Sequence, residues 1–188
     1  MKNLKILSVL LLATALVVLT SSVGAYMRKQ TPTVENAFVP AEVSCEVDEE
    51  VNQNQKTSIT VKNTGNIEAY LRLRLVTYWV VENELTGEME ILSKASKPLD
   101  FKFNKTDWLK LGDTYYYKAP VAPEGVTSDL LIKENPIILE KNPVDGSYQV
   151  VEVFAEAIQS LPEEAVEAAW NVNVVGEEGS KTIESIQP

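Results

Sequence analysis

The side chains that could do chemistry in this chain are few, and they do not gather in the sequence. Four carboxylates, Asp100, Asp107, Asp113 and Glu124, are spread over predicted loops. Paired carboxylates serve acid–base catalysis or bind a hard cation such as Ca²⁺. Solvated loop carboxylates are common, however, in a chain with 27 acidic and 17 basic residues. We therefore expect no enzyme activity, no metal site and no cofactor.

The chain has one cysteine and no histidine. The absence of histidine excludes His-based catalytic triads and the usual zinc hydrolase sites. Cys45 alternates with Val43 and Val47, so the three side chains share one face of a predicted strand. A single cysteine forms no internal disulfide, and free cysteine is commonly buried as a small apolar residue. We predict a structural role for Cys45 and no reactive thiol.

Four aromatic residues lie close together in the sequence: Trp108, Tyr115, Tyr116 and Tyr117. An exposed platform of such rings would suit a sugar or a protein partner. Aromatic side chains also dominate protein cores by buried area, and this interpretation is favoured here. The platform nonetheless defines the alternative function, a secreted or cell-surface β-sandwich binding module that does not polymerise.

Residues 1–25 differ in character from the rest of the chain. Lys2 and Lys5 give a basic start, and an apolar run follows from Ile6 to Leu19. This run is shorter than the roughly 20 apolar residues of a membrane span. A basic start, a short apolar run and small residues before the cut are typical of a cleaved export signal.

Cleavage of the export signal is predicted between Ala25 and Tyr26. Arg28 and Lys29 follow at once, so an uncleaved anchor is the alternative. The formal charge of the chain is −10 at pH 7, and removal of the lysines in the signal makes it more negative. Because this charge repels nucleic acid and anionic lipid, we expect a secreted mature protein that binds neither nucleic acid nor membrane.

The clearest structural pattern runs from Thr57 to Val81. Apolar and polar residues alternate on both sides of Asn63-Thr-Gly-Asn66, a sequence that suits a tight reversal. The pattern predicts a β-hairpin whose long arm is a central strand, with Tyr70, Arg72 and Arg74 on a solvent face. The predicted core residues of the long arm are Leu71, Leu73, Leu75 and Trp79.

A second long strand is predicted from Tyr148 to Gln159, with Val151 and Val153 on its core face. If the two long strands are neighbours, side chains of opposite charge meet across them. The predicted cross-strand ion pairs join Arg72 and Arg74 to Glu152 and Glu156.

The last part of the chain changes from strand to helix periodicity. Ser160-Leu-Pro-Glu163 has the form of a capping box, and an apolar stripe then leads to Trp170. Another short helical turn is predicted after Asn104, carrying Trp108. We predict one short C-terminal helix on the sandwich, with Trp170 inserted in the core.

These elements predict an all-β fold, an antiparallel β-sandwich of jelly-roll or immunoglobulin-like type with one short C-terminal helix. The strand spacing does not choose between the two topologies. The predicted parts are a signal peptide (1–25), an N-terminal arm (26–40), the β-sandwich domain (41–175) and a disordered tail (176–188).

Several short motifs occur in a fixed order along the mature chain. They are Val34-Glu-Asn-Ala-Phe38, Lys62-Asn-Thr-Gly-Asn-Ile-Glu-Ala-Tyr-Leu-Arg72, Asp107-Trp108, Tyr115-Tyr-Tyr-Lys-Ala-Pro-Val-Ala-Pro123, Ala155-Glu-Ala-Ile-Gln159 and Glu167-Ala-Ala-Trp170. In this order the chain resembles the TasA/camelysin-like proteins of Gram-positive bacteria, over nearly its whole mature length.

The resemblance implies a jelly-roll-like sandwich that a SipW-type signal peptidase releases during export. It also implies a place in the extracellular matrix or on the cell surface, with self-association into biofilm fibres or assembly with other matrix proteins. Some relatives carry a metallopeptidase label, which does not fit a chain without histidine.

The predicted function is therefore a secreted structural subunit of the biofilm matrix that forms fibres by β-strand addition. The polar arm from Tyr26 to Val39 is the predicted donor strand, with Val34 and Phe38 as the residues that fill pockets. Alternatively, the arm packs on its own domain or stays loose, as chain termini often do.

Overall fold

The computed structural model describes residues 39–93, 99–177 and 179–185. Contacts within the chain separate residues 1–39 from a compact unit, residues 40–188, and only this second unit is described below. The predicted export signal, its cleavage site at Ala25 and Tyr26, and the arm residues Val34 and Phe38 lie outside the described residues.

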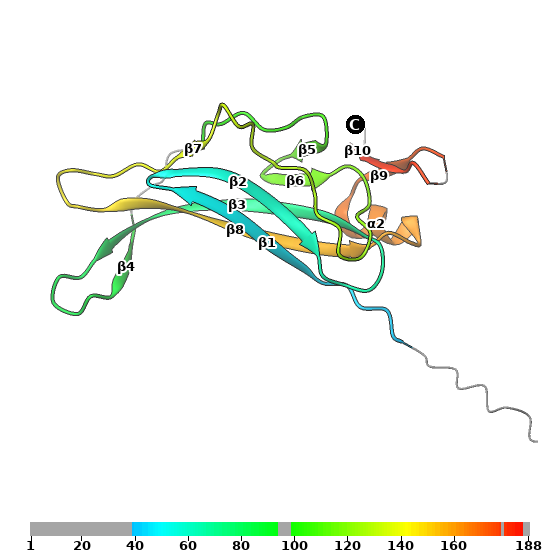
Figure 1. The fold of residues 1–188 in the computed structure, drawn as a ribbon, viewed down its shortest axis with the longest axis horizontal. Helices are drawn as coiled ribbons and strands as arrows, with labels where there is room; N and C mark the ends of the chain where they lie inside the picture. The colour runs from blue at the N-terminus through cyan, green and yellow to red at the C-terminus, as the bar shows by residue number, and fades with distance from the viewer. Residues whose placement is uncertain (1–38, 94–98, 178, 186–188) are drawn as a thin grey trace, which may run out of the picture. The chain divides into compact units, whose positions relative to one another are not determined.

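The unit is built from antiparallel strands in two main sheets (Figure 1). The first sheet has the order β1-β2-β7, with β1 at Cys45–Asn52, β2 at Gln55–Asn63 and β7 at Ile137–Ile138. The second has the order β4-β3-β6-β5, with β4 at Met89–Leu92, β3 at Ala69–Glu82, β6 at Thr114–Tyr117 and β5 at Trp108–Leu111. Strand β8, Tyr148–Gln159, pairs with β3.

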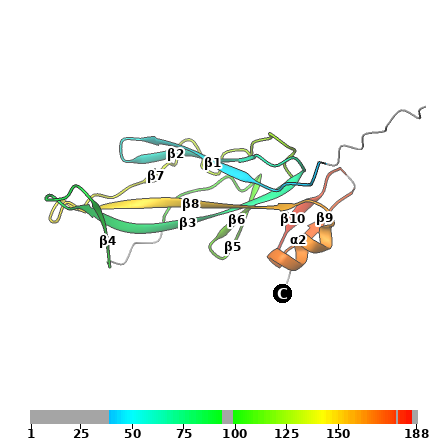
Figure 2. The same ribbon diagram turned by 90° about the horizontal axis from the view of Figure 1, so that it is seen from below.

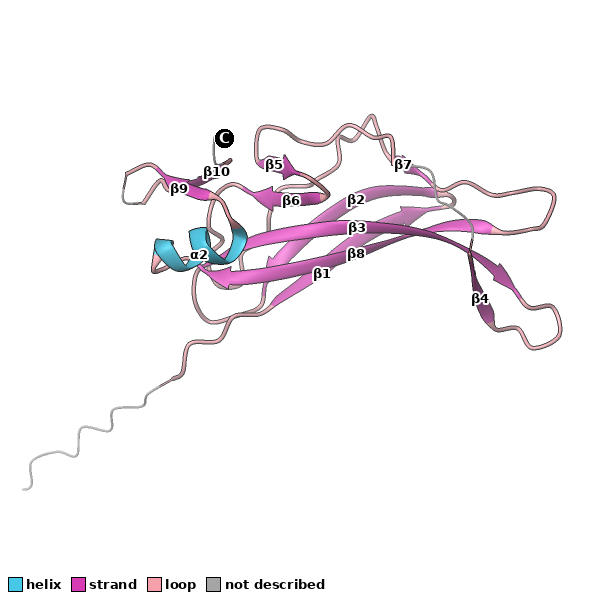
Figure 3. Cartoon of the chain, turned by 180° about the vertical axis from the view of Figure 1, so that it is seen from behind, coloured by secondary structure: helices cyan, strands magenta, loops and turns pink. Residues whose placement is uncertain are grey.

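Three further elements complete the unit: helix α2 (Glu163–Trp170) and the small sheet of β9 (Asn173–Val175) and β10 (Thr182–Glu184). Figure 2 shows β1 and β2 layered over one face of the β3–β8 ladder, with α2 on the other side of the ladder, and Figure 3 shows how little of the unit is helical. The prediction of an all-β antiparallel sandwich with one short C-terminal helix is confirmed. No helix in the described ranges has the length and apolar character to cross a membrane.

The predicted hairpin around Asn63 is wrong in its pairing, although both of its arms are strands. Strand β2 pairs with β1 through a turn at Gln53 and Asn54, and β3 belongs to the other sheet. The segment after Asn63 therefore carries the chain from one layer of the sandwich to the other. Alternating residues indicate a strand with one buried face, but they do not indicate which strand pairs with it.

Asn63 holds this crossing between the sheets and is fully buried. Its side-chain amide donates to the carbonyl oxygens of Ile67 and Val121, each at 2.8 Å, and its Oδ1 accepts from the N–H of Gly65 at 3.0 Å. Gly65 lies so close to Glu42 that a Cβ there would collide with the Glu42 carbonyl oxygen. The Asn-Thr-Gly sequence thus serves an arch between layers, where the pattern had predicted a hairpin.

Strand β3 is central, as predicted, because β8 pairs along one side of it and β4 and β6 pair along the other. Arg72 lies directly opposite Glu156, and their guanidinium and carboxylate groups are 2.6 Å apart. This predicted ion pair is confirmed. The second predicted pair is not aligned, because Arg74 lies opposite Phe154 and Glu152 lies opposite Val76.

The main core fills the space between the two sheets. Of the predicted core residues, Leu71, Leu73, Trp79 and Val151 are buried, whereas Leu75 and Val153 are half-buried and pack against the same cluster. Buried members of this cluster also come from β2, β5, β6, β7 and the segment between β6 and β7: Ile59, Val61, Trp108, Tyr115, Val121, Leu130, Leu131 and Ile137, whereas Trp79 is buried outside it.

A second, smaller core lies on the other side of β3, under α2. Trp170 is buried there, and its ring centroid lies 5.6 Å from that of Tyr116 and 4.7 Å from the guanidinium carbon of Arg72. Tyr70, which the alternation placed toward solvent, is only 1% exposed in this cluster. The helix and the small C-terminal sheet therefore cover a face of β3 that the pattern had left to solvent.

The predicted disordered tail is wrong for residues 182–184, because they form β10. Ile183 is 1% exposed in the second core, and its N–H donates to the carbonyl oxygen of Lys118. Three residues are too few to give a readable alternation, so the strand left no clear pattern in the sequence.

Two predicted helix starts are also corrected. Helix α2 has Pro162 at its N-cap without a side-chain cap, and the hydroxyl of Ser160 donates instead to Glu68 at 3.1 Å. Asn104 caps a turn that leads into strand β5, so Trp108 lies on a strand and not on a helix. Ser160 does not cap α2, because its hydroxyl is bound to Glu68, which is distant in sequence. Asn104 accepts from the N–H groups of Thr106 and Asp107 and so caps a turn instead of a helix.

Candidate functional site

The carboxylates considered for catalysis do not converge. Asp100 and Asp113 are exposed, and Glu124 forms an ion pair with Lys62. Asp107 accepts hydrogen bonds from Ser128 and Asn104, which lower its pKa. Within the described residues, no three or more acidic or cysteine side chains are arranged to hold a metal ion.

Cys45 lies half-buried at the start of β1. Burial, and to a lesser degree the negative charge of Glu156, raises the pKa of its thiol. A raised pKa keeps the thiol protonated, and the protonated form is a poor nucleophile. The environment of Cys45 agrees with a structural role.

The four clustered aromatic residues form no exposed platform. Trp108, Tyr115 and Tyr116 are buried, and Tyr117 is half-buried against the Trp108 ring at a centroid distance of 5.1 Å. Tyr115 and Tyr116 point into the two different cores, as the alternation predicted. These rings contribute to stability on both faces of β6.

The most unusual polar surface of the unit is the outer edge of β8. The N–H of Gln149 donates to Glu140, and the carbonyl oxygen of Val151 accepts from Lys56, so both residues direct main-chain groups away from β3. Main-chain groups alternate in direction along an antiparallel strand. Val153, Ala155 and Ala157 therefore point their N–H and C=O groups toward the same outer edge.

No strand of the described part of the chain pairs with this edge between Val153 and Ala157. Strand β8 is also long, at 12 residues, and its other side is held by β3 over its full length. An open, well-supported edge strand is a template for the main chain of another segment.

Strand β1 gives a second edge beside the first. The carbonyl of Ser44 accepts from Thr64 and Gly65 on the β2 side, so the alternation directs Cys45 and Val47 away from β2. Figures 1 and 2 show β1 crossing over β8, so the two edges face the same side of the sandwich. No strand of the described ranges pairs with this outer side of β1.

A groove runs between these two edges. One hollow of 560 Å³ has walls from β1 and β8 and reaches Tyr78 of β3, and a second of 450 Å³ continues past the β1–β2 turn. The two hollows share Glu49, Val150 and Val151 in their walls, so they form one surface, which we call the edge groove. Its walls also include Val47, Asp48, Val51, Glu140, Lys141 and Glu152.

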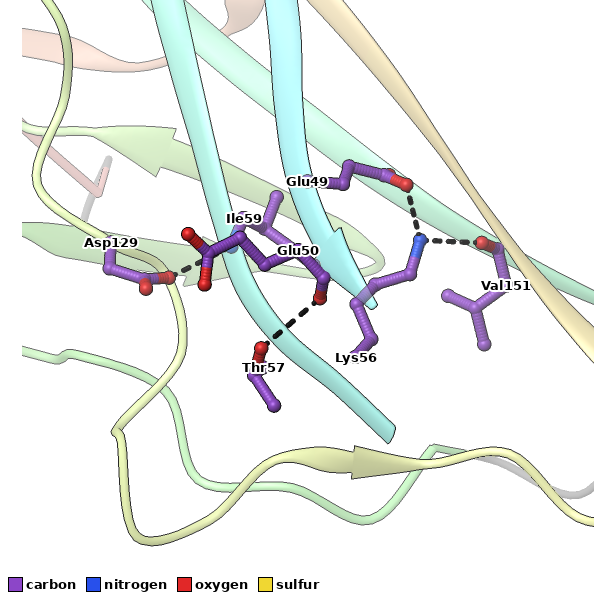
Figure 4. A network of polar contacts seen from close by, with 7 residues as sticks. All are labelled: Glu49, Glu50, Lys56, Thr57, Ile59, Asp129 and Val151. Atoms are coloured by element: carbon purple, nitrogen blue, oxygen red, sulfur yellow. Dashed lines mark hydrogen bonds and ion pairs between the residues drawn. The ribbon is translucent and has the colours of Figure 1, made fainter. Parts of the chain in front are cut away.

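Lys56 lies inside the edge groove and is only 3% exposed. Its ammonium donates to Oε2 of Glu49 on β1 at 2.7 Å and to the carbonyl oxygen of Val151 on β8 at 2.8 Å, as Figure 4 shows. The lysine thus satisfies one outward carbonyl of β8 and links the two edges. From Val153 onward, no strand of the described residues pairs with this edge of β8.

The edge groove is acidic. Asp48, Glu49, Glu140 and Glu152 contribute four carboxylates to its walls, against the ammonium groups of Lys56 and Lys141. Burial and the Glu152 carboxylate raise the pKa of Tyr78, so this phenol stays protonated and neutral. A segment with basic side chains matches this surface.

Comparison with known proteins gave no match: no family model, no curated protein and no solved structure corresponds to this chain. The edge groove is therefore the main evidence on function.

Sequence reasoning missed the edge groove and Lys56. Lys56 precedes the alternating pattern that begins at Thr57, in a polar stretch where a buried lysine is not expected. Its one available signal was its position one residue before an alternating strand, which predicts a face shared with Ser58 and Thr60. The register shift of the β1–β2 ladder at Glu50 and Val51 skips Thr57 and breaks this alternation. That signal does not predict burial.

Proposed function

We propose that the protein is a secreted structural subunit of an extracellular matrix that assembles into fibres by β-strand addition. In this assembly, residues 26–39 of one copy lie along the β8 edge of the next copy. The observation that carries the proposal is the outer edge of β8 from Val153 to Ala157, where no strand in the described part of the chain pairs with the outward main-chain groups. Main-chain hydrogen bonds along such an edge supply affinity, and the groove beside it supplies selectivity.

The composition of the arm supports it as the donor. Residues 26–39 include Arg28 and Lys29 and only one carboxylate, Glu35. The acidic walls of the edge groove, with Asp48 and Glu152 near β8, attract such a segment. Apolar Val34 and Phe38 lie four residues apart, so both point to the same face of an extended strand.

The length of the arm is also sufficient. Its 14 residues span roughly 46 Å when extended, and the five residues from Val153 to Ala157 span roughly 17 Å. The arm can therefore pair with the whole open edge and still leave a connection to its own domain. The resemblance to matrix proteins of the TasA/camelysin-like family agrees with this assembly and with export by a SipW-type peptidase.

A proline at position 155 tests the acceptor edge. Proline lacks the N–H that would point outward from Ala155, and proline is tolerated on the free side of an edge strand. We expect Ala155→Pro to remain folded by circular dichroism but to form no filaments by electron microscopy, using protein that begins at Tyr26. Ala155→Gly keeps the N–H and is the matched control, which should still form filaments.

Deletion of residues 26–39 tests the donor. We expect the truncated protein to elute as a folded monomer in size-exclusion chromatography at every concentration. Addition of a synthetic peptide of residues 26–39 should then give a one-to-one complex. Filaments formed by the truncated protein would refute the arm as donor, and filaments formed by Ala155→Pro would refute β8 as acceptor.

A further inference from the structure

A separate cavity of 440 Å³ lies where β3 begins and β8 ends. It shares no residue with the edge groove. Its walls come from the start of β3, the segment leading into α2 and the β9–β10 connection. They comprise Glu68, Tyr70, Pro120, Ser160, Leu161, Glu163, Gly179 and Lys181. A volume of this size is within the range of small-molecule sites.

Tyr70 is the notable residue of this cavity. It is 1% exposed, yet no hydrogen bond of its hydroxyl joins it to any described residue. Burial, and then the charges of Glu163 and Glu68, raises the pKa of Tyr70 to about 12. Tyr70 and both carboxylates line the cavity together. The hydroxyl is accessible from the cavity, where a ligand can form a hydrogen bond with it.

The other polar groups of the cavity are mainly hydrogen-bond acceptors. Glu68 accepts from Ser160 with one carboxylate oxygen at 3.1 Å, and Glu163 accepts from Lys181 with one oxygen at 2.9 Å. Each carboxylate has a second oxygen with capacity to accept. With two carboxylates against one lysine, the cavity carries a net negative charge, which excludes anionic ligands and favours a cation.

The Lys181 ammonium is already held by one of these carboxylates, so the chemistry of the cavity suits a primary ammonium group. We propose that this cavity binds a ligand through a primary ammonium, which donates to Glu68, Glu163 and the hydroxyl oxygen of Tyr70. The three donor hydrogens of an ammonium match these three acceptors. The apolar walls at Pro120 and Leu161 accommodate a short alkyl chain behind the charged head.

Titration of the mature protein with n-butylamine, followed by amide chemical shifts in NMR, tests this site. We expect saturable shifts at residues around Tyr70, Ser160 and Lys181. n-Butanol has nearly the same shape without the charge, and it should produce no saturable shifts. Tyr70→Phe removes only the hydroxyl and should weaken butylamine binding about fivefold to tenfold, the usual effect of one hydrogen bond.

Controls separate the cavity from other acidic surfaces. Tyr78→Phe, in the edge groove, should bind butylamine as the wild type does. Glu68→Gln should weaken butylamine binding at least tenfold, because it removes a charge from the site. If Tyr70→Phe does not fold, Glu68→Gln is the decisive variant. Equal binding of butylamine and butanol, or unchanged affinity in Glu68→Gln, would overturn the proposal.

The natural source of the ammonium is distinguished by two further probes. Nα-acetyl-lysine amide presents a side-chain ammonium, and alanine amide presents that of a chain N-terminus. Stronger binding of the first assigns the site to a lysine of a partner or to a free alkylamine, and stronger binding of the second assigns it to a chain end. Saturable binding of either supports the site, and binding of neither restricts it to free alkylamines.

Discussion

The ammonium of Lys56 lies 2.7 Å from the carboxylate of Glu49, and it joins the two edge strands at the point where the β8 edge becomes open. Lysine is rarely buried without a partner, and here the partners are one carboxylate and one main-chain carbonyl. The arrangement ties β2 to β1 and β8 through a single side chain.

Replacement of this lysine should destabilise the fold. Lys56→Met removes the charge and leaves the carboxylate of Glu49 and the carbonyl of Val151 without their donor. Loss of one partner from a largely buried ion pair costs several kcal/mol, and the partial exposure of Glu49 reduces this to about 2–4 kcal/mol. Urea unfolding followed by tryptophan fluorescence measures the change.

Lys62→Met is the matched control for Lys56→Met. Lys62 lies on the same strand, β2, and forms an ion pair with the exposed Glu124. Exposed pairs contribute little to stability, so this variant should unfold at the same urea concentration as the wild type. Equal loss of stability in both variants would contradict the role assigned to Lys56.

Stability at low pH should depend on Asp107. The Ser128 hydroxyl donates to its carboxylate at 2.6 Å and Asn104 donates at 2.9 Å, and these bonds lower its pKa, Ser128 first. A carboxyl whose pKa is lower in the folded state stabilises the fold fully above its unfolded pKa of roughly 4. This stabilisation is lost as the pH falls through the lower, folded pKa.

Ser128→Ala should therefore raise the pKa of Asp107 and shift the loss of stability to higher pH. Carboxyl chemical shifts in NMR measure the pKa directly, and urea unfolding at pH 7 and pH 3 measures the stability. Ser180→Ala is the control, because the Ser180 hydroxyl donates to a main-chain carbonyl and not to a carboxylate. An unchanged Asp107 titration in Ser128→Ala would sink this explanation.

The C-terminal strand should contribute to the stability of the whole unit. Ile183 is 1% exposed beside Val172, Val174 and Trp170. Truncation of a fully buried isoleucine to alanine costs about 2–4 kcal/mol, so Ile183→Ala should lower the thermal midpoint by several degrees. Glu184→Ala, at the exposed neighbour, should leave the midpoint unchanged. If both variants melt like the wild type, β10 is not part of the cooperative unit.

Much of the fold could be predicted from local sequence patterns. Strict alternation identified β3 and β8, and the parity of their charges predicted ion pairs between Arg72 or Arg74 and Glu152 or Glu156, of which Arg72–Glu156 is found. Alternation depends only on which face of a strand is buried, so it could not show that β2 pairs with β1 and passes over β3. The Asn-Thr-Gly sequence suits a hairpin, but here it forms an arch between the sheets, in which the Asn63 side chain donates to the carbonyl oxygens of Ile67 and Val121.

The second core and the edge groove were harder to predict for different reasons. Tyr70 alternates with Leu71 as a solvent-facing residue would, and it is buried in a cluster with residues of β6, α2, β9 and β10, all distant in sequence. The open edge of β8 beside the edge groove consists of main-chain groups, which every residue carries, so residue types cannot mark it. Its position follows from strand order, which depends on contacts distant in the sequence.

The two walls of the edge groove come from β1 and β8, about a hundred residues apart along the chain. The N-terminal arm, in contrast, is the first part of the mature sequence to be made. Under the proposed assembly, a chain that is still being synthesised therefore carries the donor segment before it has an acceptor edge of its own. In the proposed assembly, a copy can therefore serve as acceptor only after its β1 and β8 have both been made and have folded together.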